Sequence, residues 1–297
     1  MASVVTPITR QVSKPYLTLD EYKNAPTALD YGNLVQGGTQ AEQDAELTNA
    51  ITRASSYIDQ YCNQVLAATL DIEQQRARIR SDGTLRLHPK YHPIVSLNSL
   101  QLGFYPGQLT TMSDLSTVWI EEQELIVPLN SGSLTWSSQG PLSFVGAPSP
   151  RAETLVNYSY VNGYPVSMLA IASNAGATTL MLDTGLGITA GQTLKIYDGA
   201  SSENVIVASS YTYGSSTVPL ASATLYAHQI GDAVSSLPAA VKEAAILVTS
   251  SYLKIRGDAS LIMDVTNRPG QQIEGAQRVG SEIAHAQDIL KPFRRIR

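Results

Sequence analysis

Apolar residues recur in alternating steps of three and four along two stretches of the chain, and this spacing predicts two long amphipathic helices. The first helix opens at Thr39, which forms a capping-box pattern with Glu42, and it runs to about Asn63. Its apolar face consists of Leu47, Ile51, Ala54, Ile58, Tyr61 and Val65. The second helix opens at Pro238 and ends at Gly257. Its apolar face consists of Val241, Ala244, Ala245, Val248, Tyr252 and Ile255.

Two shorter helices are predicted outside this pair. Thr18 and Glu21 repeat the capping pattern and open a helix that runs from Leu19 to about Asn24. A last short helix opens at Ser281 and ends near Leu290. The termini, residues 1–16 and 257–297, hold little apolar surface, so we expect them to order only on assembly with other subunits.

Between residues 67 and 161 the apolar period changes from that of a helix to that of a strand. Alternating and β-branched runs are separated by turn residues, which predicts a β-sheet with long loops. The expected strands cover residues 75–80, 85–87, 95–102, 117–120, 124–127, 142–145 and 153–161.

Residues 166–236 interrupt this pattern, because they are rich in Gly, Ser, Thr and Ala and lack helical periodicity. Short β-branched runs predict strands at 178–182, 193–197, 204–209, 216–220 and 233–234. We therefore expect an α+β protein. Its core, residues 1–165 and 237–297, is a small helical bundle with a β-sheet or hairpin region, and residues 166–236 form an inserted all-β domain, sandwich-like or barrel-like.

The composition indicates a protein whose surface meets other proteins. Only 15% of the 297 residues are charged, and 15 Tyr stand against 3 Phe. The net charge of −5 argues against a protein that binds nucleic acid over its whole surface. Because Cys62 is the single cysteine, an intramolecular disulfide is excluded. Residues 1–7 do not show the charged start and apolar core typical of a signal peptide, and no apolar run is long enough to span a bilayer. We expect synthesis in the cytoplasm and no membrane partner.

No catalytic constellation is recognisable in the chain. His88 and His92 have no Cys or carboxylate at metal-ligand spacing, and the run Gly185 to Gly191 fits no phosphate-binding fingerprint. Glu121, Glu122 and Glu124 are best explained as surface turn charge. The sequence therefore predicts no enzyme, no catalytic residue, no cofactor and no metal.

Two basic features remain. Arg76, Arg78 and Arg80 alternate, so on a strand they project from one face, where they could contact DNA phosphates or form a solvated, salt-bridged face. The C-terminal tail carries four cations in its last seven residues, together with the apolar Phe293 and Ile296. Such a tail could touch DNA or dock into a partner's groove, and alternating bulky and basic residues favour docking.

Several segments resemble the head–tail connector proteins of tailed bacteriophages, also called head-completion or adaptor proteins. The similar segments are Leu17–Lys23, Ala54–Cys62, Leu87–Pro89 with Pro93–Leu97, Ala244–Asp258 and Ala286–Arg295. The resemblance covers about residues 15–165 and 237–297 and rests on patterns of helix, Pro and Arg.

The resemblance implies a structural virion protein at the neck, the head–tail interface. The family forms a ring, usually dodecameric, that binds beneath the portal, extends the DNA channel and presents an attachment surface to the next neck or tail protein. Double-stranded DNA would pass through it without sequence specificity. By the same resemblance, the residues expected to contact the portal are Leu290, Phe293, Arg294, Arg295 and Ile296.

Two other functions are open. The inserted domain could be a receptor- or carbohydrate-binding module of a virion, with the helical part as its anchor. An enzyme acting on virion or cell-wall polymers would need paired carboxylates in a cleft or a zinc site, and the sequence supplies neither.

Overall fold

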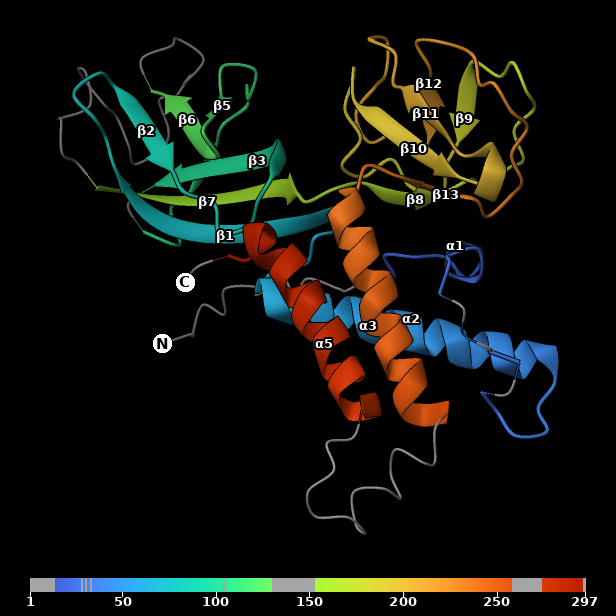
Figure 1. The fold of residues 1–297 in the computed structure, drawn as a ribbon. Coiled ribbons are helices and arrows are strands. Elements are labelled where there is room, and N and C mark those ends of the chain that lie inside the picture. Colours follow the sequence, from blue (N-terminus) through green and yellow to red (C-terminus); the bar gives the residue numbers. More distant parts are fainter. Residues whose placement is uncertain are drawn as a thin grey trace, which may run out of the picture. The chain divides into compact units, whose positions relative to one another are not determined.

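The computed structural model describes residues 14–27, 29, 31, 32, 34–103, 105–129, 153–257 and 274–295. It is a mixed α+β protein, as the sequence predicts, with helices and several antiparallel sheets (Figure 1). Contacts within the chain group the described residues of 68–163 into one compact unit and those of 12–67 and 164–297 into another. The division into a core and an inserted domain at residues 166 and 236 stays a prediction.

The first unit is built from two antiparallel sheets. One has the order β1-β7-β3-β4, from strands Thr69–Arg78, Glu153–Asn162, Ile94–Gly103 and Thr110–Thr111. The other has the order β2-β6-β5, from strands Thr84–Leu87, Glu124–Pro128 and Trp119–Glu121. Their shared core contains Leu85, Leu87, Leu100, Leu125, Val127, Val156, Tyr158 and Tyr160. The expected strand at 142–145 lies outside the described residues.

Strand β1 is longer than expected, because it begins at Thr69 and pairs with β7 along its whole length. The alternation at its start is inverted: Leu70 is exposed, whereas Asp71 is buried. Asp71 is satisfied there by Asn162 Nδ2 at 2.6 Å and by the Thr69 hydroxyl at 2.9 Å. Because a polar residue occupies a core position, the apolar pattern does not indicate a strand in this half of β1.

The second unit contains the helices α1 (Leu19–Lys23), α2 (Gln40–Cys62), α3 (Ala239–Gly257) and α5 (Glu274–Leu290). Thr18 and Thr39 each form a complete capping box, which confirms both predicted helix starts. Helix α5 packs along α3, and both contact α2 (Figure 1). The buried core of this bundle includes Leu47, Ile51, Ala54, Ile58, Val241, Ala244, Ala245, Val248, Ala286 and Leu290.

The C-terminal helix corrects the expected helix start. It begins at Glu274, seven residues earlier than Ser281, although Gly275 and Gly280 each disfavour a helix by about 1 kcal/mol. Ala286 and Leu290 are fully buried against the bundle. Their packing stabilises a helix that local propensity alone does not predict. That the terminal segments order only on assembly stays a prediction.

Residues 166–236 form two small antiparallel sheets with their own apolar core. The larger has the order β11-β10-β13-β8, from strands Glu203–Ile206, Thr193–Tyr197, Ala233–Ser235 and Val166–Met168. The smaller pairs β12 (Thr217–Pro219) with β9 (Thr179–Met181), and a short 3-10 helix, η1, covers Gly199–Ser201. No sheet among the described residues closes into a barrel. The core contains Leu180, Leu182, Ile188, Leu194, Ile196, Val205, Val207, Val218 and Val234.

The two ends of this segment meet. Strand β8, where the segment starts, pairs with β13, where it ends. The Pro165 carbonyl accepts hydrogen bonds from the Ser235 hydroxyl at 3.0 Å and from the Ser236 amide at 3.2 Å. The chain therefore leaves the segment beside the point where it entered. The sequence pattern missed β8, which is only three residues long.

Candidate functional site

The C-terminal segment lies against the C-terminal end of α2. Its last helical turn is the 3-10 helix η2 (Lys291–Phe293), after which the backbone is extended at Arg294. The Arg295 amide donates to the Cys62 carbonyl at 2.9 Å. The side chains of Asn63 and Gln64 donate to the carbonyls of Arg295 and Phe293, each at 3.2 Å. These bonds satisfy backbone groups at a helix end and hold the tail on its own chain.

The structure places the five residues predicted for portal contact in different surroundings. Leu290 is fully buried in the bundle core, and Phe293 is partly buried against it. The guanidinium of Arg294 lies 5.4 Å from the centre of the Tyr61 ring, and Arg294 is exposed. Arg295 is partly buried, and Ile296 lies outside the described residues. In this form Leu290 offers no surface to a partner, whereas Arg294 does.

The thiol of Cys62 lies beneath this segment. Burial, and then the nearby carboxylate of Asp59, raise the pKa of Cys62 to about 12, while Arg294 opposes the shift. The thiol is therefore protonated at neutral pH, as expected of a packed side chain that is not a nucleophile.

Arg76 and Arg78 of β1 and Arg80, which lies two residues beyond its end, are all exposed, as the alternation predicts. Arg76, Arg78 and Arg80 are exposed, while Ala77 and Ile79 between them are buried. Arg78 Nε lies 3.1 Å from Glu153 Oε1 on the neighbouring strand. Among the described residues no carboxylate lies within ion-pair distance of Arg76 or Arg80. Two of the three cations are thus available to an anionic partner.

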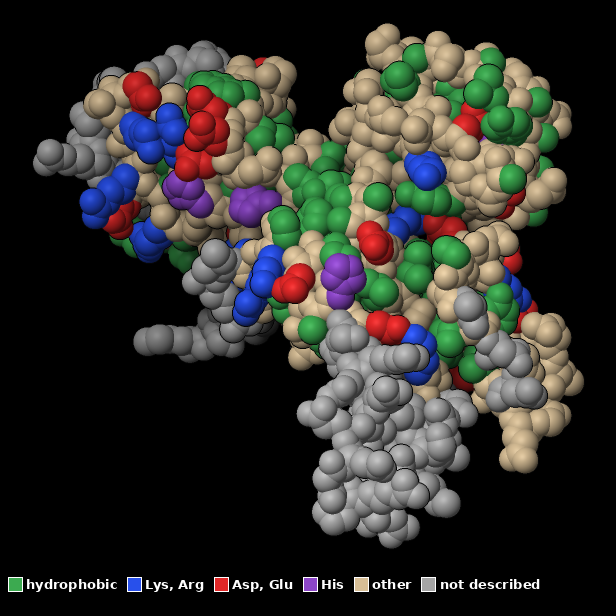
Figure 2. Space-filling view, in the orientation of Figure 1, with side chains coloured by type: hydrophobic (Ala, Val, Ile, Leu, Met, Phe, Trp, Pro, Cys, Tyr) green, Lys and Arg blue, Asp and Glu red, His purple; other side chains and the backbone are tan. Residues whose placement is uncertain are grey.

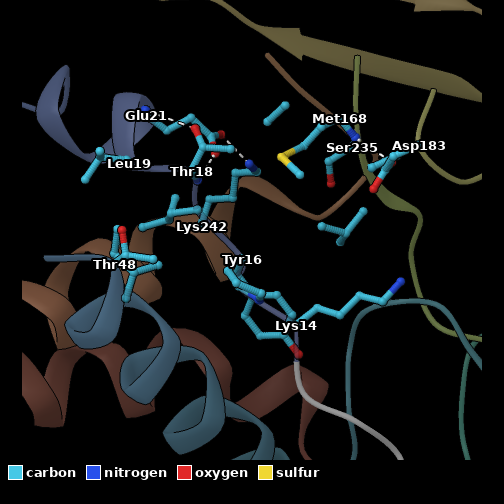
Figure 3. A pocket seen from close by; sticks show the side chains of 16 residues that line it. Lys14, Tyr16, Thr18, Leu19, Glu21, Thr48, Met168, Asp183, Ser235 and Lys242 are labelled. Carbon is cyan, nitrogen blue, oxygen red and sulfur yellow. Dashed lines mark hydrogen bonds and ion pairs between the residues drawn. The ribbon is translucent and has the colours of Figure 1, made fainter. Parts of the chain in front are cut away.

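A pocket of about 390 Å³ lies between the segment before α1, helix α2 and strands β8 and β13 (Figure 3). Leu17, Ile51, Val166 and Met168 supply its apolar wall. An ion pair between Lys242 of α3 and Glu21 of α1 lies at its edge.

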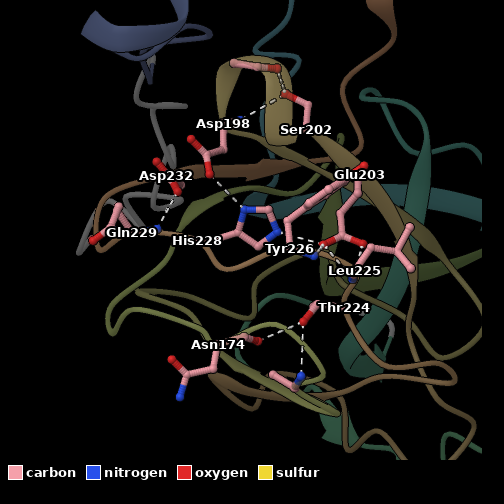
Figure 4. Close-up of polar contacts among 12 residues, drawn as sticks. Asn174, Asp198, Ser202, Glu203, Thr224, Leu225, Tyr226, His228, Gln229 and Asp232 are labelled. Carbon is pink, nitrogen blue, oxygen red and sulfur yellow. Dashed lines mark hydrogen bonds and ion pairs between the residues drawn. The ribbon is translucent and has the colours of Figure 1, made fainter.

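A buried polar network in the inserted segment was missed by the sequence analysis. Both nitrogens of the His228 ring contact carboxylates: Nδ1 lies 3.2 Å from Asp198 Oδ2, and Nε2 lies 2.8 Å from Glu203 Oε1 (Figure 4). The Glu203 carboxylate also accepts from the Leu225 and Tyr226 amides at 2.9–3.1 Å. The pKa of Glu203 is lowered because these hydrogen bonds outweigh its desolvation by burial.

The surface of residues 166–236 is poor in charge. The segment contains five charged residues, Asp183, Lys195, Asp198, Glu203 and Asp232. Figure 2 shows few charged side chains over this segment, where hydrophobic side chains are scattered among other groups. The exposed large apolar side chains of the segment are Met168, Ile171, Met181, Ile206, Tyr213, Leu225, Tyr226 and Ile230.

Comparison with known proteins gives no family. No protein-family model matches the chain, and no curated protein matches it. Among solved structures, a chain from the neck of an empty GTA particle computed with C6 symmetry is similar over 97% of each chain, with a TM-score of 0.34 and 12% identity. A likeness at this level assigns neither a fold family nor a function.

Within the described part of the chain, no helix has both the length and the apolar character needed to cross a membrane.

Proposed function

We propose that this protein is a structural component of a virion, a head–tail connector that forms a ring beneath the portal and extends the DNA channel. On this proposal it has no enzymatic role, and the ring presents a surface to the next neck or tail protein. The ring would be dodecameric, as in the family that the sequence resembles.

One observation carries this proposal. The helical segments on which the resemblance rests pack into one core. They are Ala54–Cys62 of α2, the part of α3 from Ala244 onward, and the end of α5 up to Leu290. Residues 166–236 separate the first of them from the others in sequence, yet both ends of that segment meet at Pro165. Such an arrangement is expected of a connector core that carries an additional module.

The C-terminal segment is the part we propose to meet the portal. Arg294 is exposed next to the C-terminal end of α2. Beside it, the Arg295 amide donates to the Cys62 carbonyl, and the Phe293 carbonyl accepts from the Gln64 side chain. Leu290 would act indirectly, because its burial fixes the direction in which the tail leaves the bundle. The exposed face of Arg76, Arg78 and Arg80 is our candidate for a transient contact with DNA phosphates.

The surface of the inserted segment also supports an assembly role. The large apolar side chains of Leu225 and Ile230 are 72% and 68% exposed in the single chain. Apolar groups on a charge-poor surface are typical of protein interfaces. We propose that this module faces another virion protein.

Negative-stain microscopy of the concentrated protein, alone and with its matching portal, tests the proposal. Rings with a central hole in either sample are expected, and their symmetry would give the copy number. A monomer that does not associate with the portal would contradict the connector role. Saturable binding of a glycan by such a monomer would support the receptor-binding alternative.

A further inference from the structure

Three potential metal ligands within residues 166–236 lie together at one end of β10 and β13, the two central strands of the larger sheet. Asp198 follows β10, and His228 and Asp232 precede β13. One ligand atom from each residue lies within 4.8 Å of the other two. His228 is buried, whereas Asp198 and Asp232 are half-buried (Figure 4). A metal ion with ligand distances of about 2.0–2.2 Å needs only a small closure of such a cluster.

The hydrogen-bond partners of His228 determine which ring nitrogen carries a hydrogen in the neutral ring. Glu203 is an acceptor that already receives two backbone amides, so Nε2 must donate its hydrogen to Oε1 at 2.8 Å. In the neutral ring Nδ1 then carries a lone pair, and it points at the Asp198 carboxylate at 3.2 Å. Two acceptors facing each other in a buried site need a cation between them, either a proton or a metal ion.

The local charge favours a metal ion over a proton. Asp20 of α1, Asp198 and Asp232 line a neighbouring pocket of about 490 Å³, and Glu203 lies behind His228. The pocket's cation, Lys242, is already paired with Glu21. One proton on His228 would balance only one of the four remaining carboxylates.

We propose that His228 Nδ1, Asp198 and Asp232 bind a divalent transition-metal ion of the Zn²⁺ class. Glu203 fixes the ring tautomer from behind, in the carboxylate–histidine–metal arrangement found at zinc sites. One imidazole and two carboxylates suit Zn²⁺ better than Ca²⁺, which prefers oxygen ligands alone. The adjoining pocket leaves room for water in the remaining coordination positions. This inference is independent of the connector proposal.

Calorimetric titration of the EDTA-treated full chain with ZnCl₂ tests the site. We expect about one ion per chain, and at least a tenfold loss of affinity in Asp198→Asn and in Asp232→Asn. His88→Gln serves as the matched control, because His88 Nδ1 lies 3.1 Å from Glu124 in an exposed pair that could hold zinc adventitiously. The control should bind as the unmodified protein does.

Titration with Co²⁺ provides a second readout that requires no variant. A bound Co²⁺ should shift and broaden the imidazole signals of His228 in the NMR spectrum of the unmodified protein. Absence of Zn²⁺ binding, or binding that survives both aspartate substitutions, or binding lost in His88→Gln, would overturn the proposal.

Discussion

Lys242 of α3 and Glu21 of α1 form an ion pair whose two side chains are only 7% and 8% exposed. The ammonium group also lies 3.7 Å from the centre of the Tyr197 ring on β10. Glu21 at the same time closes the capping box of α1 through the Thr18 amide at 2.7 Å. One cation thus links the first helix, the third helix and the inserted segment. Burial lowers the pKa of Lys242, and Glu21 opposes that shift.

Breaking this pair from one side should be costly. In Lys242→Met the Glu21 carboxylate stays buried without its counter-charge, so we expect the free energy of unfolding to fall by about 3–5 kcal/mol. Adding Glu21→Gln removes the buried charge and should restore part of the loss. Urea unfolding of the two single variants and the double variant measures the coupling.

The matched control for that experiment is an exposed pair. Arg53 lies 2.9 Å from Glu46 on α2, with its side chain 46% exposed. Arg53→Ala should change stability by less than about 1 kcal/mol. A loss in Lys242→Met no larger than this control would show that the buried pair is not a structural link.

Substitutions at Leu290 and Arg294 should distinguish the contribution of the tail to stability from its contribution to portal binding. Leu290→Ala removes a fully buried side chain and should lower the free energy of unfolding by about 2–5 kcal/mol. Arg294→Ala removes an exposed side chain and should leave unfolding within about 0.5 kcal/mol, while it weakens association with the portal. Urea unfolding and co-sedimentation with the portal measure the two effects. Normal portal association by Arg294→Ala would remove that residue from the proposed contact.

The long helices could be predicted from the sequence, because α2 combines a complete capping box with a sustained apolar face. The start of α5 could not, because local propensity, with Gly275 and Gly280 in its first turns, does not indicate a helix there. Strand β1 shows the same limit, where Asp71 occupies a core position through its bond to Asn162, ninety-one residues away.

The polar network around His228 could not be predicted for a similar reason. Its carboxylates lie 25 and 30 residues away in sequence, so no local spacing reveals them. The available signal was compositional: one histidine and four carboxylates, Asp183, Asp198, Glu203 and Asp232, in a segment otherwise almost without charge. The shared face of the β1 arginines, by contrast, follows directly from alternation.

Cys62 should report whether the tail is docked. With a pKa of about 12, roughly one thiol in ten thousand is ionised at pH 8, so the native protein should react with a thiol reagent about a thousandfold more slowly than the unfolded chain. The reaction should accelerate as pH rises, because the thiolate fraction grows. The rate of colour release from a disulfide reagent, with and without guanidinium, measures both effects.

A chain ending at Leu290 tests the cover that the tail provides. It lacks Phe293 and the Arg295 amide that bonds to Cys62, so its thiol should react faster than that of the full chain. Arg294→Ala isolates the charge effect, since losing this cation should raise the thiol pKa further and slow the reaction. Equal rates in the truncated and full chains would mean that the tail does not shield the thiol.

The arginine face of β1 makes a quantitative prediction for DNA. If Arg76, Arg78 and Arg80 each contact a phosphate, replacing all three by Gln should weaken binding to a short duplex and reduce the slope of log K against log salt by about 3. If Arg78 stays paired with Glu153 in the complex, it contacts no phosphate, and the slope should then change by about 2. Fluorescence anisotropy across a salt series measures the slope, with Arg53→Gln on α2 as the control cation. An unchanged slope in the triple variant would assign these arginines to a solvated strand face.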